Sequence, residues 1–249
     1  MTTAGPGQGT VFLSALSRDL ELACAPTGGL AAYLSPAEAE SARKYTRAGD
    51  RLDYAASHAL FRLLAARQLG RQPLAARHLQ VTRSCAGCGS TAHGKPEVAG
   101  LSLSLSRSHG AVMAAAGPAG TPVGADIELV PGNLFKGFDD YVASTDERLG
   151  LAPQDVPARL RLWVAKEAVL KAAGLGLAVT PAAVHLAPVD AGTPERTLLR
   201  ADCPGTPQVH GLTAAAVAAP DGYAAAVSAA SDLPAATLPL ADLLLARAA

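Results

Sequence analysis

Two short stretches of the sequence hold the residue types that could carry chemistry. Asp126 and Glu128 stand two apart in "GADIEL", and Glu167 and Lys171 stand four apart in "WVAKEAVLK". On a strand, side chains two apart face the same way, so Asp126 and Glu128 project together. Neighbouring carboxylates repel each other, and a divalent cation removes that cost. The pair therefore suits Mg²⁺, which takes one or two carboxylates plus water and substrate phosphates, although a solvated sheet face produces the same pattern.

The second stretch predicts one shared helix face. At about 100° per residue, Trp163, Glu167 and Lys171 lie on the same side of a helix, while Lys166 points the other way. The alternative is an ordinary Glu–Lys pair one turn apart, beside a tryptophan in the core. We assign Trp163 to the core, with the wall of a ligand pocket as the alternative.

The elements that position these residues begin with helices. Ser35 and Glu38 form a capping box around Pro36, which predicts a helix start. A break near 48–49 divides this helical region, and the second helix runs from about Asp50 to Leu69. Gly70 can take the left-handed conformation that ends it.

Alternating residues in "LSLSLSRS" (101–108) predict a half-buried strand. "AVMAAAG" (111–117) and "TPVGADIEL" (121–129) read as two further strands, and we expect all three to form one small antiparallel sheet.

The later segments repeat this order of helix and strands. We expect a helix over 160–173 that ends at Gly174, a strand in "PAAVHLAP", and a hairpin over 209–230 around Pro220-Asp221-Gly222. Helices and antiparallel strands in separate runs predict an α+β fold with two related halves.

Composition narrows the class of protein. Of 249 residues, 49% are hydrophobic and 17% are charged, which is typical of a globular chain. The absence of a signal-peptide layout and of a long apolar run predicts a cytoplasmic protein that does not enter a membrane. Lys and Arg balance Asp and Glu at 21 each, which gives no support for nucleic-acid binding.

The charge is unevenly distributed along the chain. Residues 1–124 hold 12 Lys and Arg against 7 Asp and Glu, so the remainder is acidic to the same extent. A basic half facing an acidic half suits a phosphate-rich ligand between a cationic pocket and a metal site, although chance unevenness explains the split equally well.

Cys85 and Cys88 form a C-x-x-C with His93 close behind. A structural zinc site needs four ligands, and the remaining cysteines, Cys24 and Cys203, are far away in sequence. We read the segment as a Gly-rich turn of reduced thiols rather than a zinc or redox site.

The combination of G-x-D-x-E at Gly124–Glu128 with W-x-x-K-E-x-x-x-K at Trp163–Lys171 resembles the signature of the 4'-phosphopantetheinyl transferases. The larger, surfactin-synthetase-activating type is the nearest in layout. "AAGLGL", "GKP" (94–96) and "SLSRS" (104–108) add matches in the family's order, and the resemblance spans about residues 47–177.

This resemblance implies transfer of phosphopantetheine from coenzyme A to a serine of a carrier protein, with release of 3',5'-ADP. It implies Asp126, Glu128 and Glu167 as Mg²⁺ ligands. Glu167 would also be the base for the carrier serine. Lys171 would balance charge on the pyrophosphate or protonate the leaving group.

At the other end of coenzyme A, the resemblance implies a phosphate-binding role for four residues, namely Lys95, Pro96, Ser106 and Arg107. Arg51 and His58, on the preceding helix, are looser candidates. Arg107 stands where the family has histidine. It keeps its charge and can hold a phosphate, but it cannot take a role that requires it to give up a proton. His109 would face the same side of a regular strand, but we expect it in the turn.

The resemblance also implies the architecture: a pseudo-dimer of two similar α+β subdomains in one monomeric chain, with the active site in the cleft. We expect residues 1–10 as a flexible tail. Residues 11–124 would form the subdomain of the coenzyme A phosphate pocket, and residues 125–249 the subdomain of the metal and catalytic residues. Its partners would be acyl, aryl or peptidyl carrier proteins of fatty acid, polyketide or nonribosomal peptide synthesis.

Two other functions remain open. An Mg²⁺-dependent phosphohydrolase would use the same carboxylates with water as the nucleophile. A non-catalytic carrier-binding or zinc-containing module would need no Mg²⁺ at all.

Overall fold

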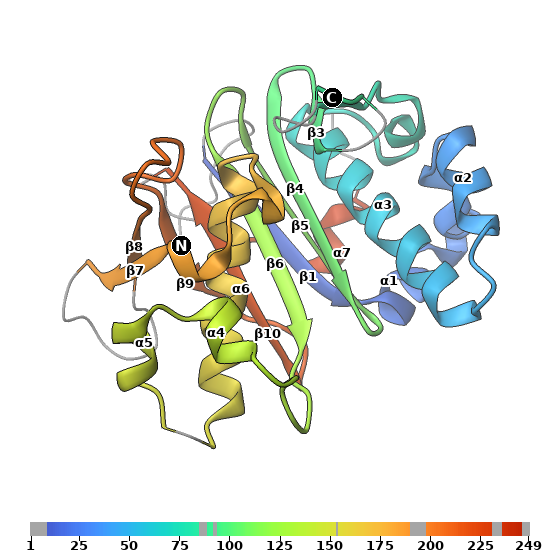
Figure 1. Ribbon diagram of the computed structural model, residues 1–249. Helices are drawn as coiled ribbons and strands as arrows, with labels where there is room; N and C mark the ends of the chain where they lie inside the picture. The colour runs from blue at the N-terminus through green and yellow to red at the C-terminus, as the bar shows by residue number, and fades with distance from the viewer. Residues whose placement is uncertain are drawn as a thin grey trace.

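Two β-sheets, each covered by one long helix, organise the chain (Figure 1). The computed structural model describes residues 9–84, 89–91, 94–152, 154–189, 198–230 and 236–245. This is the predicted α+β class, and each half repeats the packing of a long helix on a mainly antiparallel sheet, as expected of a pseudo-dimer. None of the described helices is long and apolar enough to cross a membrane.

The first half packs helix α3 against a six-stranded sheet with the order β11-β1-β5-β4-β3-β2. Its helices are α1 (Ser17–Cys24), α2 (Pro36–Arg43) and α3 (Ala48–Gln68), with short 3-10 turns at Ala25–Thr27, Leu30–Tyr33 and Pro73–His78. Its strands are β1 (Val11–Leu16), β2 (Thr82–Ser84), β3 (Lys95–Val98), β4 (Leu101–Ser108) and β5 (Ala111–Pro118).

The helix signals of the first half are confirmed. Ser35 and Glu38 form both hydrogen bonds of the capping box that begins α2. A break does divide the helical region, but it lies at residues 44–47, ahead of the predicted 48–49, because α3 already begins at Ala48. Gly70 follows α3 with a positive φ of 65°. Because the capping residues satisfy backbone groups locally, these boundaries could be read without knowledge of the rest of the fold.

The second half packs helix α6 against a five-stranded sheet with the order β6-β10-β9-β8-β7. Its helices are α4 (Phe138–Val142), α5 (Thr145–Leu149) and α6 (Val156–Ala172), with 3-10 turns at Gly176–Ala178 and Pro181–Ala183. Its strands are β6 (Val123–Leu129), β7 (His185–Pro188), β8 (Leu198–Asp202), β9 (Thr213–Ala216) and β10 (Tyr223–Ala229). The predicted helix and hairpin are confirmed as α6 and as β9 with β10.

The expectation of one sheet containing β4, β5 and β6 is wrong. β4 pairs with β5 as predicted, but β6 pairs with β10 along its whole length, from Val123 opposite Ala229 to Leu129 opposite Tyr223. Strands that follow one another in sequence often pair, but β6 is instead an edge strand of the second sheet. The β5–β6 connection therefore crosses from one half to the other.

The prediction that β4 is only half buried is also wrong. Its leucine face packs toward α3, while Ser104, Ser106 and Ser108 are each less than 10% exposed on the other face. That face lies against β6, where Ala125 donates its backbone N–H to Ser104 Oγ at 3.0 Å. Serine hydroxyls can be buried here because they find partners on the edge of β6.

A third core lies between the two sheets. Alanines, valines and other apolar side chains of β1, β5, β6 and β10 meet there, among them Phe12, Met113, Ile127 and Val227. The two halves are therefore joined by a packed apolar layer as well as by the serine contacts.

The end of the chain returns to the first half. β11 (Ala236–Thr237) pairs in parallel with β1, and α7 (Leu240–Leu243) packs with α3 through the buried side chain of Leu243. A boundary at residue 124 falls inside β6. The division at that residue also assigns β11 and α7 to the second subdomain, although both pack against the first.

Lys166 anchors α5 to α6 from a fully buried position. Its ammonium donates to Val142 O at 2.8 Å and to Glu147 Oε2 at 2.6 Å, and the side chain is 0% exposed. This agrees with its predicted place away from Glu167 and gives Lys166 a structural role.

Lys166→Met is expected to lower the free energy of unfolding by about 3 kcal/mol, because it leaves a partly buried carboxylate without its cation. Urea unfolding measures the loss. The double variant Lys166→Met with Glu147→Gln should recover part of it, since the stranded charge is removed. Equal losses in the single and double variants would contradict this account.

Candidate active site

Gly124 brings β6 into direct backbone contact with α6. A Cβ placed at this position would lie 1.8 Å from Ala168 O and 2.6 Å from Ala172 N. Such distances are impossible for real atoms, so only hydrogen fits. The glycine that opens the G-x-D-x-E motif therefore sets the spacing between strand and helix, and with it the spacing between the carboxylates that each carries.

Asp126 is the most buried of the three carboxylates, at 2% exposed. Its Oδ1 accepts hydrogen bonds from Lys171 Nζ at 2.6 Å and from Ser106 Oγ at 2.7 Å. Its Oδ2 is buried and has no hydrogen-bond partner among the described residues. One oxygen is thus engaged within the protein, and the other is buried without a partner among the described residues.

Glu128 lies on the same strand, two residues further on, as predicted. Ser108 Oγ donates to its Oε2 at 2.5 Å. Burial raises the pKa of Glu128 and the charge of Asp126 raises it further, while the hydrogen bond from Ser108 opposes the shift. The two β6 carboxylates are therefore close enough to repel each other, as their spacing suggested.

Glu167 faces them from α6. Burial, and then the negative charge of Asp126, raise its pKa to about 7, although Lys171 partly offsets the effect. Its Oε1 is buried, and no hydrogen bond to it is found within the described parts of the chain. A carboxyl group with a pKa near neutrality is suited to accept a proton at physiological pH.

The donor set fits a hard divalent cation. Two buried carboxylate oxygens without partners and two carboxyl groups with raised pKa values indicate a site with too little positive charge, because three carboxyl groups share the single ammonium of Lys171. Over the described residues, no three His, Cys, Asp or Glu side chains form a ready-made cluster of metal ligands. Mg²⁺ does not require one, because it commonly uses one or two carboxylates and completes its shell with water and substrate phosphates.

The raised pKa of Glu167 predicts a pH-dependent stability. Its folded pKa exceeds the unfolded value, so the folded state holds the proton more tightly. The contribution of this group to the free energy of unfolding is fully present below about pH 4.5 and is lost as the pH rises through about 7. In EDTA, wild-type protein should lose up to about 3 kcal/mol from this group between pH 5 and pH 8.

Urea unfolding of wild-type and Glu167→Gln protein across this pH range measures the effect. The wild-type minus variant difference in unfolding free energy should change with pH, and Mg²⁺ should stabilise the wild-type protein more at pH 7.5 than at pH 5.5. Parallel pH profiles for the two proteins would contradict the assignment.

A pocket of about 520 Å³ adjoins these residues, between the first sheet and the end of α6. Its polar lining includes Lys171, Lys95 and Arg83, and its apolar lining includes Leu105 and Leu175. The G-x-G segment after α6 forms one wall, with positive φ at Gly174 and Gly176. The pocket thus joins a cationic surface to the carboxylate site through Lys171.

Lys95 and Pro96 stand on β3 at this pocket, where the "GKP" motif predicted a ligand contact. The ammonium of Lys95 donates to Ala172 O, at the end of α6, at 3.0 Å. Burial lowers its pKa, with the charge of Glu97 opposing. Sequence reasoning missed Arg83. This residue is on β2, lies opposite Pro96 of β3 and lines the same pocket. Its strand is three residues long, too short for a periodic signal.

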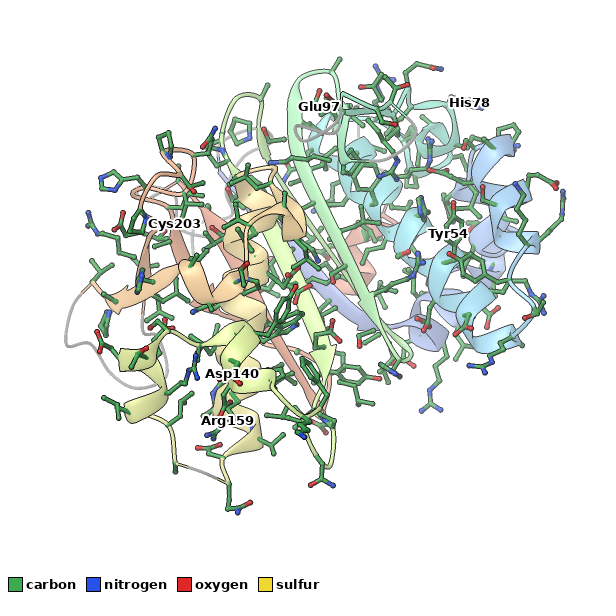
Figure 2. The ribbon with its side chains drawn as sticks, viewed as in Figure 1. Tyr54, His78, Glu97, Asp140, Arg159 and Cys203 are labelled. Atoms are coloured by element: carbon green, nitrogen blue, oxygen red, sulfur yellow. The ribbon has the colours of Figure 1, made fainter. Side chains whose placement is uncertain are left out.

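Arg107 lies apart from this pocket, at an exposed position near the end of β4, on the strand face that turns toward α3. Its guanidinium lies over the rings of Tyr54 and Tyr45 at 5.1 and 5.6 Å from their centroids and donates to Tyr45 Oη at 2.9 Å. Tyr54 is labelled in Figure 2. Arg51 is exposed nearby, and its guanidinium donates to Tyr45 O. The aromatic pair holds the Arg107 cation in place while leaving it open to solvent.

His58 belongs to a buried ionic network. Its Nδ1 lies 3.1 Å from Glu38 Oε1, and Arg62 Nε donates to Glu38 Oε2 at 2.5 Å. Burial would raise the pKa of Glu38, but the hydrogen bonds from His58, Arg62 and the Ser35 backbone outweigh it and lower the pKa to about 2. The network borders a second pocket of about 550 Å³, which Arg83 also lines.

The remaining sequence candidates are placed as follows. Ser106 is buried, with its hydroxyl on Asp126 and Lys171. His109 is in the β4–β5 turn with φ of 43°, which confirms the expected turn position. Trp163 packs with the second core, beside Phe138 and Tyr141, in agreement with its core assignment.

The cysteines give no support for a zinc site in the described part of the chain. Cys24 and Cys203 are buried free thiols that belong to different cores, and Figure 2 labels Cys203 in the second half. Cys85, Cys88 and His93 lie outside the described residues.

Comparison with known families matches residues 122–228 to the model of the 4'-phosphopantetheinyl transferase superfamily. The match covers all of β6 and α6, and hence Asp126, Glu128, Glu167 and Lys171. It excludes Lys95 and Arg107. No curated protein matches the chain. The similarity therefore supports the superfamily through the half that carries the carboxylate site.

Proposed function

We propose that this protein is a 4'-phosphopantetheinyl transferase. It would move the phosphopantetheine group of coenzyme A to a serine hydroxyl of an apo carrier protein and release 3',5'-ADP. The observation that carries the proposal is the meeting of Asp126, Glu128, Glu167 and Lys171 at the β6–α6 contact, inside the region similar to this superfamily.

In this reaction a bond forms between the carrier serine oxygen and the β-phosphorus of coenzyme A, and the pyrophosphate bond breaks. Glu167, which faces the two β6 carboxylates from α6, accepts the serine proton, directly or through a water molecule. Lys171 offsets the charge that develops on the leaving phosphate or protonates it.

We propose Mg²⁺ as the cofactor, held by Asp126, Glu128 and Glu167. When bound, it would neutralise charge on the pyrophosphate and polarise the phosphorus. Asp126 Oδ2 and Glu167 Oε1, both buried without partners in the described chain, support this assignment. The ion pair with Lys171 holds the Asp126 carboxylate in place before the cation arrives.

We propose that the basic first half supplies most of the pocket for the adenosine and phosphate end of coenzyme A, and that Lys171 of the second half completes it. Lys95, Pro96 and Lys171 are supported by their place around one pocket. Arg107 and Arg51 lie together beside Tyr45 and offer solvent-facing cations. His58 would act through the Glu38 network, and Ser106 through Asp126 and Lys171, because both polar groups are already engaged.

Lys95→Ala is expected to raise KM for coenzyme A by about tenfold to a hundredfold, because one charged hydrogen bond to the ligand is lost. Initial rates with the carrier in excess measure it. Lys136→Ala, at an exposed lysine outside this pocket, is the matched control and should leave KM within twofold. An unchanged KM in Lys95→Ala would remove Lys95 from the coenzyme site.

Two halves of similar construction in one chain favour the larger type of the family acting as a monomer. Acyl, aryl or peptidyl carrier domains of fatty acid, polyketide or nonribosomal peptide synthesis would be the protein substrates, in the cytoplasm.

The second candidate is an Mg²⁺-dependent phosphohydrolase, which the same raised pKa of Glu167 would serve. Coenzyme A incubated with the protein but without a carrier separates the two. Release of 3',5'-ADP under these conditions would favour the hydrolase. A module without catalysis predicts instead that neither Mg²⁺ nor Glu167→Gln has any effect.

A further inference from the structure

We propose that Ser108 is a positioning residue that orients the Glu128 carboxylate for the divalent cation. Together with Ser106 it forms a matched pair of serines on β4 that serves the two carboxylates of β6. The inference rests on the proposed function, because the cation is part of that proposal.

The pairing follows from the shared period of two strands. Side chains at 106 and 108 project from the same face of β4, and those at 126 and 128 from the same face of β6. β4 and β6 lie side by side. Moving two residues along both strands therefore leads from the pair Ser106 and Asp126 to the pair Ser108 and Glu128. Ser106 meets Asp126 at 2.7 Å, and Ser108 meets Glu128 at 2.5 Å.

The neighbours of each serine fix the direction of its hydrogen bond. The Leu129 backbone N–H, with its nitrogen 3.3 Å from Ser108 Oγ, can only donate, so it does not compete for the hydroxyl proton of Ser108. Ser108 donates this proton to Glu128 Oε2 at 2.5 Å, a shorter contact than the 3.0 Å to His109 Nδ1. At Ser106, the ammonium of Lys171 lies 3.1 Å away and likewise only donates. Each serine therefore donates to one oxygen of one carboxylate and leaves the second oxygen free of that bond.

The tip of the β4–β5 hairpin holds Ser108 in this position. His109 Nδ1 lies 3.0 Å from Ser108 Oγ. Tyr223 Oη donates to His109 O at 2.5 Å, and the Gly110 N–H donates to Asp53 Oδ2 at 2.8 Å. The hairpin tip is thus hydrogen-bonded to β10 in the second half and to α3 in the first. These two contacts hold the Ser108 hydroxyl in place beside Glu128.

This role is distinct from packing. Hydrogen bonds to ligating carboxylates set their orientation, and their loss typically costs about tenfold to a hundredfold in metal affinity. A serine that merely fills space would affect stability without changing the affinity for metal.

The test measures Mn²⁺ affinity by electron paramagnetic resonance in the presence of coenzyme A and without carrier protein. Ser108→Ala is expected to weaken Mn²⁺ binding by about tenfold to a hundredfold, and to raise KM for Mg²⁺ with little change in KM for coenzyme A. Ser108→Thr, which keeps the hydroxyl, should restore affinity to within a few-fold of wild type.

Ser102→Ala is the matched control. It lies on the same strand and face, and among the described residues no hydrogen bond joins it to β6. Its Mn²⁺ affinity should equal that of wild type. If Ser108→Ala does not fold, Ser108→Cys serves in its place and should show the same weakening, because a thiol fills the space but donates weakly.

Mn²⁺ affinity within twofold of wild type in a folded Ser108→Ala or Ser108→Cys protein would overturn the inference. So would an equal loss in Ser102→Ala. Transfer by wild-type protein, assayed in parallel, reports on the proposed function separately: active wild type with no effect of Ser108 rejects only the inference, whereas inactive wild type rejects the function.

Discussion

Glu167→Gln protein is expected to lose phosphopantetheine transfer, with kcat lower by a factor of about 10² to 10⁴, the usual contribution of a general base. The amide keeps the size of the side chain but can neither accept the serine proton nor supply a negative charge to the cation. The loss should appear in kcat, measured with saturating coenzyme A and carrier, because in the proposed mechanism Glu167 accepts the proton of the reacting hydroxyl.

The same substitution should not harm folding. Burial and the charge of Asp126 already make ionised Glu167 unfavourable, so a neutral amide is expected to be neutral or stabilising in the absence of metal above pH 7. Glu40→Gln, at an exposed side chain of α2 paired with Arg43, is the matched control and should retain full activity. Wild-type kcat in Glu167→Gln would remove Glu167 from the chemistry.

Gly124→Ala is expected to cost about 3 kcal/mol or more of unfolding free energy, at or above the upper end for overpacking, and to inactivate the protein. The added methyl group would overlap Ala168 O and Ala172 N, which are backbone atoms that cannot rotate away. α6 must move from β6, and that movement separates Glu167 from Asp126.

Gly49→Ala provides the control for this variant. Gly49 lies in the first turn of α3, where an added Cβ would have no atom within 4 Å and φ is not positive, so alanine should be neutral or slightly stabilising. Thermal unfolding of both variants measures the contrast. Gly124→Ala protein with wild-type stability and activity would contradict the close-approach argument.

The parts of the fold that could be predicted are those determined by local signals. The capping box at Ser35 and Glu38 and the glycine that follows α3 act within a few residues. The place of β6 could not be predicted in this way. Its partner β10 lies about a hundred residues further along the chain, and nothing within the β6 segment itself identifies that partner.

In the candidate site, too, local spacing could be read from the sequence, whereas contacts between distant segments could not. The spacing of Asp126 with Glu128 and of Glu167 with Lys171 predicted which side chains share a face. The structure brings Lys171 to Asp126 and raises the pKa of Glu167 by burial. The burial of Ser108 against β6 had no local signal, because alternating Leu and Ser is equally typical of a strand with a solvent-facing side. The stacking of Arg107 on Tyr45 and Tyr54 likewise depends on contact between β4 and the helices.

The most direct test of the central claim is the intact mass of an apo carrier protein after incubation with this protein, coenzyme A and Mg²⁺. The account predicts a mass gain of one phosphopantetheine group, with release of 3',5'-ADP. It predicts that EDTA prevents both and that Glu167→Gln slows both by a factor of about 10² to 10⁴. Carriers of fatty acid, polyketide and nonribosomal peptide synthesis should be tried in parallel. No gain on any of them, from folded protein that still binds coenzyme A, would contradict the account.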